Sequence, residues 1–181
     1  MLKLDENPPL RSSSEPLEAA QGQWWVAHTK SRCEKSLAWS LFGKNIPYFF
    51  PMVMRTAVWG GRKRKVLKPL FPSYLFFCGS EEERQAAFLT GHLFMTIAVR
   101  QRQQFIRELC AIETAMASNV DLELENLIIP GRRCRVSRGA LKGIEGTIIQ
   151  RHGRTRLLLE VSIVGRGTSL EIDGDLLESI D

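Results

Sequence analysis

The residues of this chain that could perform acid–base, nucleophilic or metal chemistry are few and far apart. The three histidines, His28, His92 and His152, are isolated from one another. No serine or cysteine lies in the strand-to-helix turn of an activated nucleophile, and no paired carboxylates stand in an apolar setting. The sequence therefore predicts a protein that is not an enzyme and that needs no cofactor.

Other ligand arrangements are also missing from the sequence. Acidic residues gather near the C-terminus, but they read as the solvated side of a final strand and tail, so no metal site is predicted: Glu171, Asp173, Asp175, Glu178 and Asp181. The glycine spacing at 139–146 precedes a strand, whereas a phosphate-binding loop precedes a helix. The cysteines are widely spaced, without a CxxC, and are expected to be reduced thiols in a cytoplasmic protein: Cys33, Cys78, Cys110 and Cys134.

The distribution of charge points to binding. The chain has a formal net charge of +5, with 44% hydrophobic and 25% charged residues, which is ordinary globular composition. Residues 23–118 hold 14 basic and 6 acidic residues, a net charge of +8. Such a surplus favours contact with phosphates or with an acidic protein, although simple solubility would also account for it.

The stretch Lys68–Cys78, KPLFPSYLFFC, is too apolar for a loop and too short to cross a membrane. Its prolines restrict it to a strand that begins near Ser73. Alternation sends Tyr74 and Phe76 to one face, and Leu75 and Phe77 to the other, so neither face is polar. Either both faces are packed within the domain, or one face is an exposed apolar patch that binds a partner.

The apolar pattern of residues 23–118 predicts the elements that position these residues. Strands are expected at 23–29, 46–50, 52–58, 73–78 and 94–99, with a turn at Gly60-Gly61 that places the basic run in a hairpin. Helices are expected after the capping boxes Ser31–Glu34 and Ser80–Glu83, the first ending at Gly43, and again over 105–116. The order is that of a ferredoxin-like βαββαβα sheet, in an α+β protein.

The remaining segments differ in texture. Residues 1–22 combine prolines and serines without apolar periodicity and are predicted to form a disordered leader, with neither a signal peptide nor a membrane span in the chain. Residues 119–129 are expected to be a flexible acidic linker, although their leucines could equally dock on a neighbouring surface. Residues 130–181 carry short strands with many glycines and predict a small closed β-barrel.

The start of this last segment resembles a known motif. Val136, Gly139, Gly143, Ile144 and Gly146, followed by β-branched residues, look like the KOW motif of SH3-like barrels in ribosomal and transcription proteins. A generic small barrel with glycine turns would show a similar pattern.

The first domain strengthens this resemblance. Its Trp24-Trp25-Val26 start, the Lys30-led helix, Pro51, the basic loop and the octapeptide PLFPSYLF at 69–76 resemble the NGN domain of the NusG/RfaH transcription elongation factors. The resemblance covers roughly residues 23–180, and the octapeptide favours the specialised RfaH-like branch. It implies domains at 23–118 (NGN) and 130–181 (KOW).

The resemblance implies an activity by binding, with antitermination or reduced pausing as its result. Family members sit on the clamp helices of the largest RNA polymerase subunit, and the positions that fall on that contact surface are His28, Phe71, Pro72, Tyr74 and Phe76. The KOW domain recruits a second partner, in the family the small ribosomal subunit or Rho. Ile144 and 163–164 are our expectation for that contact, and a monomer is expected.

Basic residues are expected to meet DNA. Lys30 and Arg32 match positions near which RfaH-like members meet the non-template strand. The basic run could reach upstream DNA through a sequence-independent, salt-sensitive contact: Arg62, Lys63, Arg64 and Lys65. A plain solvated surface is the alternative for both groups.

Two departures from RfaH matter. This chain has Gln85-Ala86-Ala87 where RfaH-like members carry His-Thr-Thr, which puts bridging to the opposite side of the polymerase in doubt. Its C-terminal glycines disfavour a helical refolding of the second domain, so a stable barrel is expected. A rival hypothesis is an RNA-binding or ribosome-associated KOW protein, in which the aromatic strand is core.

Overall fold

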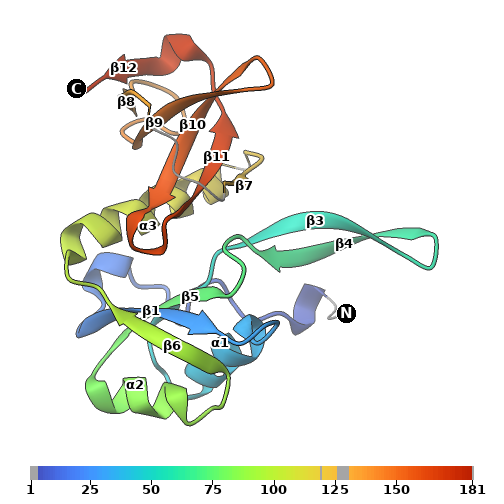
Figure 1. Ribbon diagram of the computed structural model, residues 1–181, viewed down its shortest axis with the longest axis vertical. Coiled ribbons are helices and arrows are strands. Elements are labelled where there is room, and N and C mark those ends of the chain that lie inside the picture. Colours follow the sequence, from blue (N-terminus) through green and yellow to red (C-terminus); the bar gives the residue numbers. More distant parts are fainter. Residues whose placement is uncertain (1–3, 119, 126–130, 181) are drawn as a thin grey trace. The chain divides into compact units, whose positions relative to one another are not determined.

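A computed structural model describes residues 4–118, 120–125 and 131–180 of the chain (Figure 1). The chain divides into two units, Met1–Arg102 and Gln103–Asp181. Residues 1–3 of the predicted leader, 119 and 126–129 of the predicted linker, and 130 and 181 of the predicted barrel lie outside the described residues. The domain bounds 23–118 and 130–181 stay predictions, because the division falls within the third helix, α3 (Arg102–Ala117).

The first unit is built on a four-stranded sheet. Its strands are β1 (Gln23–Thr29), β2 (Tyr48–Phe49), β5 (Tyr74–Gly79) and β6 (Leu93–Ala98). Their order is β2-β5-β1-β6, and every neighbouring pair is antiparallel. This is the split βαβ order of a ferredoxin-like sheet, so the predicted fold class is confirmed. β1 and β5 are central strands, whereas β2 and β6 are the edges.

Helices α1 (Glu34–Gly43) and α2 (Glu81–Phe88) lie on one face of this sheet (Figure 1). Leu37 and Leu41 of α1, with Ala87 of α2, join Leu75 and Phe77 of β5 in one buried cluster. The predicted capping box of α2 is present, because Ser80 Oγ accepts from Glu83 N–H at 3.2 Å and Ser80 N–H donates to the Glu83 carboxylate at 2.7 Å.

The start and end of α1 differ from the prediction. Cys33 occupies the N-cap position without a side-chain hydrogen bond, so the predicted Ser31–Glu34 capping box is absent. Gly43 is the last helical residue, and the left-handed conformation falls at Asn45 (φ 56°). The Glu34 carboxylate instead accepts a hydrogen bond from Ser73 N–H, in the loop before β5. This bond competes with local capping of α1.

The described part of the predicted leader is ordered on the first unit, contrary to the expectation from its composition. Leu17 is buried, Phe50 N–H donates to Leu10 O at 2.8 Å, and Tyr48 Oη donates to Pro9 O at 3.0 Å. β2 is an edge strand, and unpaired backbone groups along an edge favour pairing with any extended chain nearby. Polar composition does not prevent such pairing, because backbone groups make most of these bonds.

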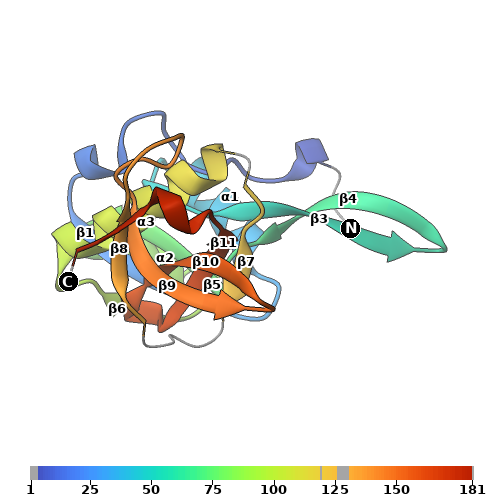
Figure 2. The ribbon, with the colours of Figure 1, turned by 90° about the horizontal axis from the view of Figure 1, so that it is seen from above.

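β3 (Met52–Trp59) and β4 (Arg62–Pro69) form a separate antiparallel hairpin. Gly60 (φ 54°) and Gly61 (φ 74°) make its tight turn, as predicted, because both positions need positive φ. The hairpin runs out from the rest of the first unit in both ribbon views (Figures 1 and 2).

The β-rich second unit contains six antiparallel strands in the order β12-β8-β9-β10-β11-β7. They are β7 (Glu123–Glu125), β8 (Arg133–Val136), β9 (Glu145–Arg151), β10 (Arg154–Val161), β11 (Arg166–Glu171) and β12 (Leu177–Ser179). The short strands expected in residues 130–181 are present. β7 lies inside the predicted linker and pairs with β11.

Helix α3 is tied to the strands of this unit through Glu108. The Glu108 carboxylate accepts from Ser162 N–H at 3.1 Å and from Ser162 Oγ at 2.6 Å. Burial and the neighbouring Glu108 raise the pKa of Glu160. A predicted amphipathic helix therefore uses a polar side chain for this contact.

Candidate functional site

An apolar surface surrounds His28 on the face of the sheet opposite α1 and α2. The His28 ring is half-buried, stacks on Tyr74 at 4.9 Å between ring centroids, and meets the edge of Phe94 at 5.5 Å. The register pairs His28 with Tyr74 on one side and with Met95 on the other. Side chains at paired positions share one face of a sheet.

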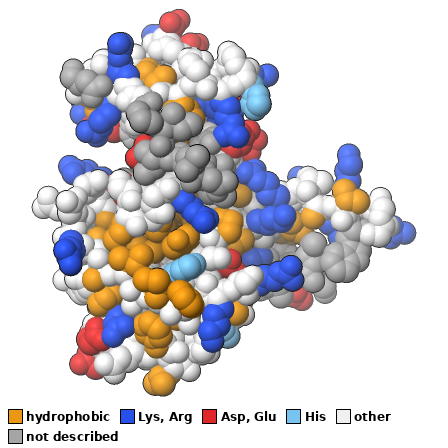
Figure 3. Space-filling model, viewed as in Figure 1, with side chains coloured by type: hydrophobic (Ala, Val, Ile, Leu, Met, Phe, Trp, Pro, Cys, Tyr) orange, Lys and Arg blue, Asp and Glu red, His pale blue; other side chains and the backbone are white. Residues whose placement is uncertain are grey.

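We call this surface the His28 patch: it consists of His28, Tyr74, Phe94, Met95 and Ile97. Phe94 is 68% exposed and Met95 is 41% exposed. Figure 3 shows a broad area of hydrophobic side chains on this unit with a histidine among them. Exposed apolar area that is continuous over several side chains marks an interaction surface in a folded protein.

A strained loop residue holds Tyr74 in this patch. Ser73 has φ 69°, a left-handed conformation that costs a non-glycine residue free energy. Its N–H donates to the buried Glu34 carboxylate at 2.9 Å, and its carbonyl accepts from Thr29 N–H at 2.8 Å. The two bonds fix both sides of Ser73, so the entry into β5 is set by α1 and β1 together.

The five residues predicted to contact the polymerase divide into surface and core. Pro72 is exposed, and His28 and Tyr74 are half-buried. Phe71 and Phe76 are 1% and 0% exposed, with ring centroids 6.0 Å apart. Their predicted place on the contact surface is therefore wrong, because Phe76 lies in the central strand β5 with its side chain covered, and Phe71, which precedes β5, packs against the Phe76 ring.

The sequence interpretation missed the part of the patch that comes from β6. In the sequence analysis Phe94, Met95 and Ile97 belong to the expected strand 94–99 and have no functional role. The signal that could have found them is the one used for Lys68–Cys78, namely apolar residues on both faces of a strand.

The predicted nucleic-acid contacts lie on two elements. The basic run on β4 is exposed throughout: Arg62, Lys63, Arg64 and Lys65. Lys30 and Arg32 are also exposed and lie in the turn between β1 and α1, before the helix begins. The structure brings the four hairpin residues together and leaves Lys30 and Arg32 on a separate turn.

The predicted KOW residues make the turn from β8 into β9. Val136 N–H donates to Ile144 O at 2.9 Å and Gly143 N–H to Val136 O at 2.8 Å, while Gly139 and Gly143 both have φ 87°. At Gly146 a Cβ would lie 2.5 Å from Leu158 O, which excludes other residues. Ile144 is buried, so the expectation that it contacts a partner is wrong.

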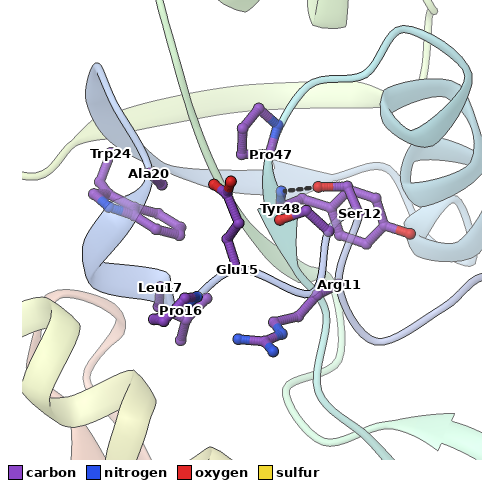
Figure 4. A pocket seen from close by; sticks show the side chains of 10 residues that line it. Arg11, Ser12, Glu15, Pro16, Leu17, Ala20, Trp24, Pro47 and Tyr48 are labelled. Carbon is purple, nitrogen blue, oxygen red and sulfur yellow. Dashed lines mark hydrogen bonds between the residues drawn. The ribbon is translucent and has the colours of Figure 1, made fainter.

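Two hollows among the described residues offer little to a small ligand. One of about 30 Å³ lies between the leader and β2, where Tyr48 N–H donates to Ser12 Oγ at 3.1 Å (Figure 4). An open hollow of about 420 Å³ in the second unit is lined by charged groups that pair with each other, Arg154 with Glu171 at 2.6 Å and Arg156 with Glu123 at 3.5 Å. The first hollow is too small for a cofactor, and the second lacks the apolar lining of a cofactor pocket.

Across residues 4–118, 120–125 and 131–180, no three His, Cys, Asp or Glu side chains are grouped so that they could hold a metal ion. In the same ranges no helix combines the length and the apolar character that spanning a membrane demands.

The chain is similar to known proteins, and the family match covers most of the first unit. Residues 22–108 match the family model described as "Transcription termination factor nusG". Among solved structures, the fold is similar to the one described as "Domain interaction in Thermotoga maritima NusG", with 15% identity, a TM-score of 0.47, and coverage of 89% of this chain and 98% of that chain. No curated protein matches the sequence.

Proposed function

We propose that this chain, which belongs to the NusG family through residues 22–108, binds RNA polymerase through the His28 patch. Members of this family are transcription factors that act in elongation and antitermination, and they generally bind the polymerase. The specific proposal is that the patch docks on the clamp helices of the largest subunit and that pausing or termination falls as a result. We also propose that the protein acts as a cytoplasmic monomer.

The observation that carries this proposal is the exposure of Phe94 and Met95 beside His28. A monomer gains nothing from leaving these side chains in water, whereas a partner helix that covers them would recover the free energy of burying them. The His28 and Tyr74 rings stack on each other, and Ser73 is fixed on both sides by hydrogen bonds. A preorganised surface loses less entropy on binding.

The test is binding of the full-length protein to purified core RNA polymerase at moderate salt. Phe94→Asp should weaken binding about 30-fold or more, since a central aromatic contact contributes about 2 kcal/mol or more. Phe42→Asp is the control, because Phe42 is an exposed phenylalanine (41%) on α1, outside the His28 patch. Equal binding by the wild type and both variants would remove the His28 patch from the interface.

The finer assignments follow from the resemblance and belong to the same proposal. Lys30, Arg32 and the hairpin cations contact non-template or upstream DNA. The KOW unit recruits the small ribosomal subunit or Rho, and the RfaH-like branch is favoured by the octapeptide at 69–76. If instead the purified protein binds RNA tightly, ignores the polymerase and loses RNA as salt rises, the RNA-binding hypothesis replaces this one.

A further inference from the structure

Residues 4–22 of the leader, which we call the strap, are bonded to the first unit at both ends. Near the start of the strap, Lys35 Nζ of α1 donates to Asn7 Oδ1 at 2.6 Å. Near its end, the Arg102 guanidinium at the beginning of α3 donates to Ala20 O at 2.5 Å. The strap therefore connects α1 with the start of α3.

Between these ends the strap lies along the edge strand β2. Phe50 N–H donates to Leu10 O at 2.8 Å. Tyr48 donates to Pro9 O through its hydroxyl at 3.0 Å and to Ser12 Oγ through its N–H at 3.1 Å (Figure 4). The strap thus occupies the place that a further strand would take at this edge of the sheet.

The same bonds reach the base of the β3–β4 hairpin on both of its strands. Lys35 Nζ, which holds the strap, also donates to Leu67 O near the end of β4 at 2.7 Å. Phe50, which bonds the strap as well, stands just before β3 begins. The first turn of the strap, Leu4–Glu6, lies beside the hairpin in both ribbon views (Figures 1 and 2). The strap is therefore linked to the hairpin at both strands of its base.

The hairpin is buried at its base and exposed further out. Met52 belongs to the buried cluster of the first unit and Leu67 packs against it, whereas Met54 and Val58 are 45% and 68% exposed. An isolated two-stranded hairpin is marginal in water. The direction in which this hairpin points therefore depends on how its base is held.

The strap is attached to the sheet by few buried side chains. Among its described side chains, only Pro8 and Leu17 are buried. Its helical structure consists of two short 3-10 turns, Leu4–Glu6 and Leu17–Ala19. Segments with few buried apolar contacts open at a lower free-energy cost than core strands. The strap is thus expected to open before the sheet unfolds.

We propose that the strap fixes the direction of the β3–β4 hairpin, and that opening of the strap makes the hairpin mobile while the sheet stays folded. The leader is then a conformational control on the hairpin. The proposal goes beyond the proposed function. Only one consequence rests on that function, namely that the strap controls the contact of the hairpin with DNA.

Hydrogen exchange of the full-length protein tests this with two substitutions in the same turn of the strap. Leu17→Asp places a carboxylate at a buried position and should release the strap, whereas Ala19→Asp adds the same group at an exposed position and should not. In Leu17→Asp the Phe50 amide should exchange at least about tenfold faster, because a buried leucine is lost from the closed state. The Leu70 amide, which donates to Pro51 O at the hairpin base, should become faster as well, while the amides that join β1 to β5 keep their rates.

A milder substitution covers the case in which Leu17→Asp does not fold. Asn7→Ala removes the acceptor that the strap offers to Lys35 and leaves Leu17 in place. It should speed exchange at Leu70 about threefold or more, because one charged hydrogen bond is lost. No change at Leu70 in Asn7→Ala would overturn the proposal.

The Leu17→Asp variant has two results of its own that would refute the strap. Faster exchange at Phe50 with an unchanged rate at Leu70 would show that the hairpin does not depend on the strap. Equal acceleration at Leu70 and in β1 would show that the sheet opens together with the strap.

These measurements involve neither polymerase nor DNA, so this proposal and the proposed function fail separately. Phe94→Asp, the variant for polymerase binding, should leave exchange at Phe50 and Leu70 unchanged. Loss of polymerase binding by Phe94→Asp would leave the strap untouched, and an unchanged Leu70 rate in Leu17→Asp would leave the His28 patch untouched.

Discussion

Strands β5 and β6 are both rich in apolar residues, yet one lies in the core and the other exposes its side chains. Phe76 of β5 is fully buried between neighbouring strands and rings, whereas Phe94 of β6 is largely exposed. β5 lies inside the sheet and β6 is at its edge. An aromatic strand therefore lies in the core or at the surface according to its place in the sheet order, and its composition alone does not distinguish the two.

The most direct test of this difference between β5 and β6 is to truncate one aromatic side chain on each strand. Phe76→Ala should lower the free energy of unfolding by about 3–5 kcal/mol, because it leaves a cavity in a filled core. Phe94→Ala should change it by less than about 1 kcal/mol, because the ring is mostly in water. Denaturant unfolding of both variants measures this, and comparable losses would contradict the assignment of β6 as a surface strand.

Removing the Glu34–Ser73 hydrogen bond tests whether it holds Tyr74 at the surface, at the start of the otherwise buried strand β5. Glu34→Ala should cost about 2 kcal/mol of unfolding free energy, since it leaves the Ser73 N–H without its charged acceptor. Polymerase binding should fall as well, because Tyr74 is no longer held against His28.

Glycine at position 73 provides the control for this contact. Ser73→Gly accepts a left-handed backbone without strain, so adding it to Glu34→Ala should restore part of both stability and binding. Recovery of stability without any recovery of binding would show that the contact supports the fold and does not position Tyr74.

A smaller effect on stability is expected from replacing Arg84 of α2, which contacts β6 through Thr96. The Arg84 guanidinium bonds Thr96 Oγ1 at 3.3 Å, lies over the Trp25 ring at 5.2 Å, and pairs with Glu81, whose pKa it lowers. Arg84→Gln should lower the melting temperature by a few degrees at most, because the pair is exposed.

The difference in stability between wild type and Arg84→Gln should depend on pH, because Arg84 lowers the pKa of Glu81. A carboxyl whose folded pKa is lowered adds stability above its unfolded pKa and loses it as pH falls through the folded value. The gap between wild type and Arg84→Gln should therefore shrink below the ordinary carboxyl range. A gap that widens in acid would exclude the ion pair as its cause.

Local signals in the sequence predicted the elements well where no distant residue competes. The Gly60-Gly61 turn and the Ser80–Glu83 box form as expected, because each is completed by residues a few positions apart. Ser31–Glu34 has the same spacing and fails, because Glu34 bonds Ser73, 39 residues away. Composition likewise predicted disorder for a leader whose backbone pairs along the edge strand β2.

The chain alone therefore determined the element order, the ferredoxin-like class, the β-rich second unit and the positive charge of the hairpin, since periodicity, turn residues and charge are local properties. Only the tertiary structure decided which aromatic residues are core and which are surface, and that the leader pairs with the edge strand β2. Both depend on sheet order and register, which arise from pairing between segments far apart in the sequence.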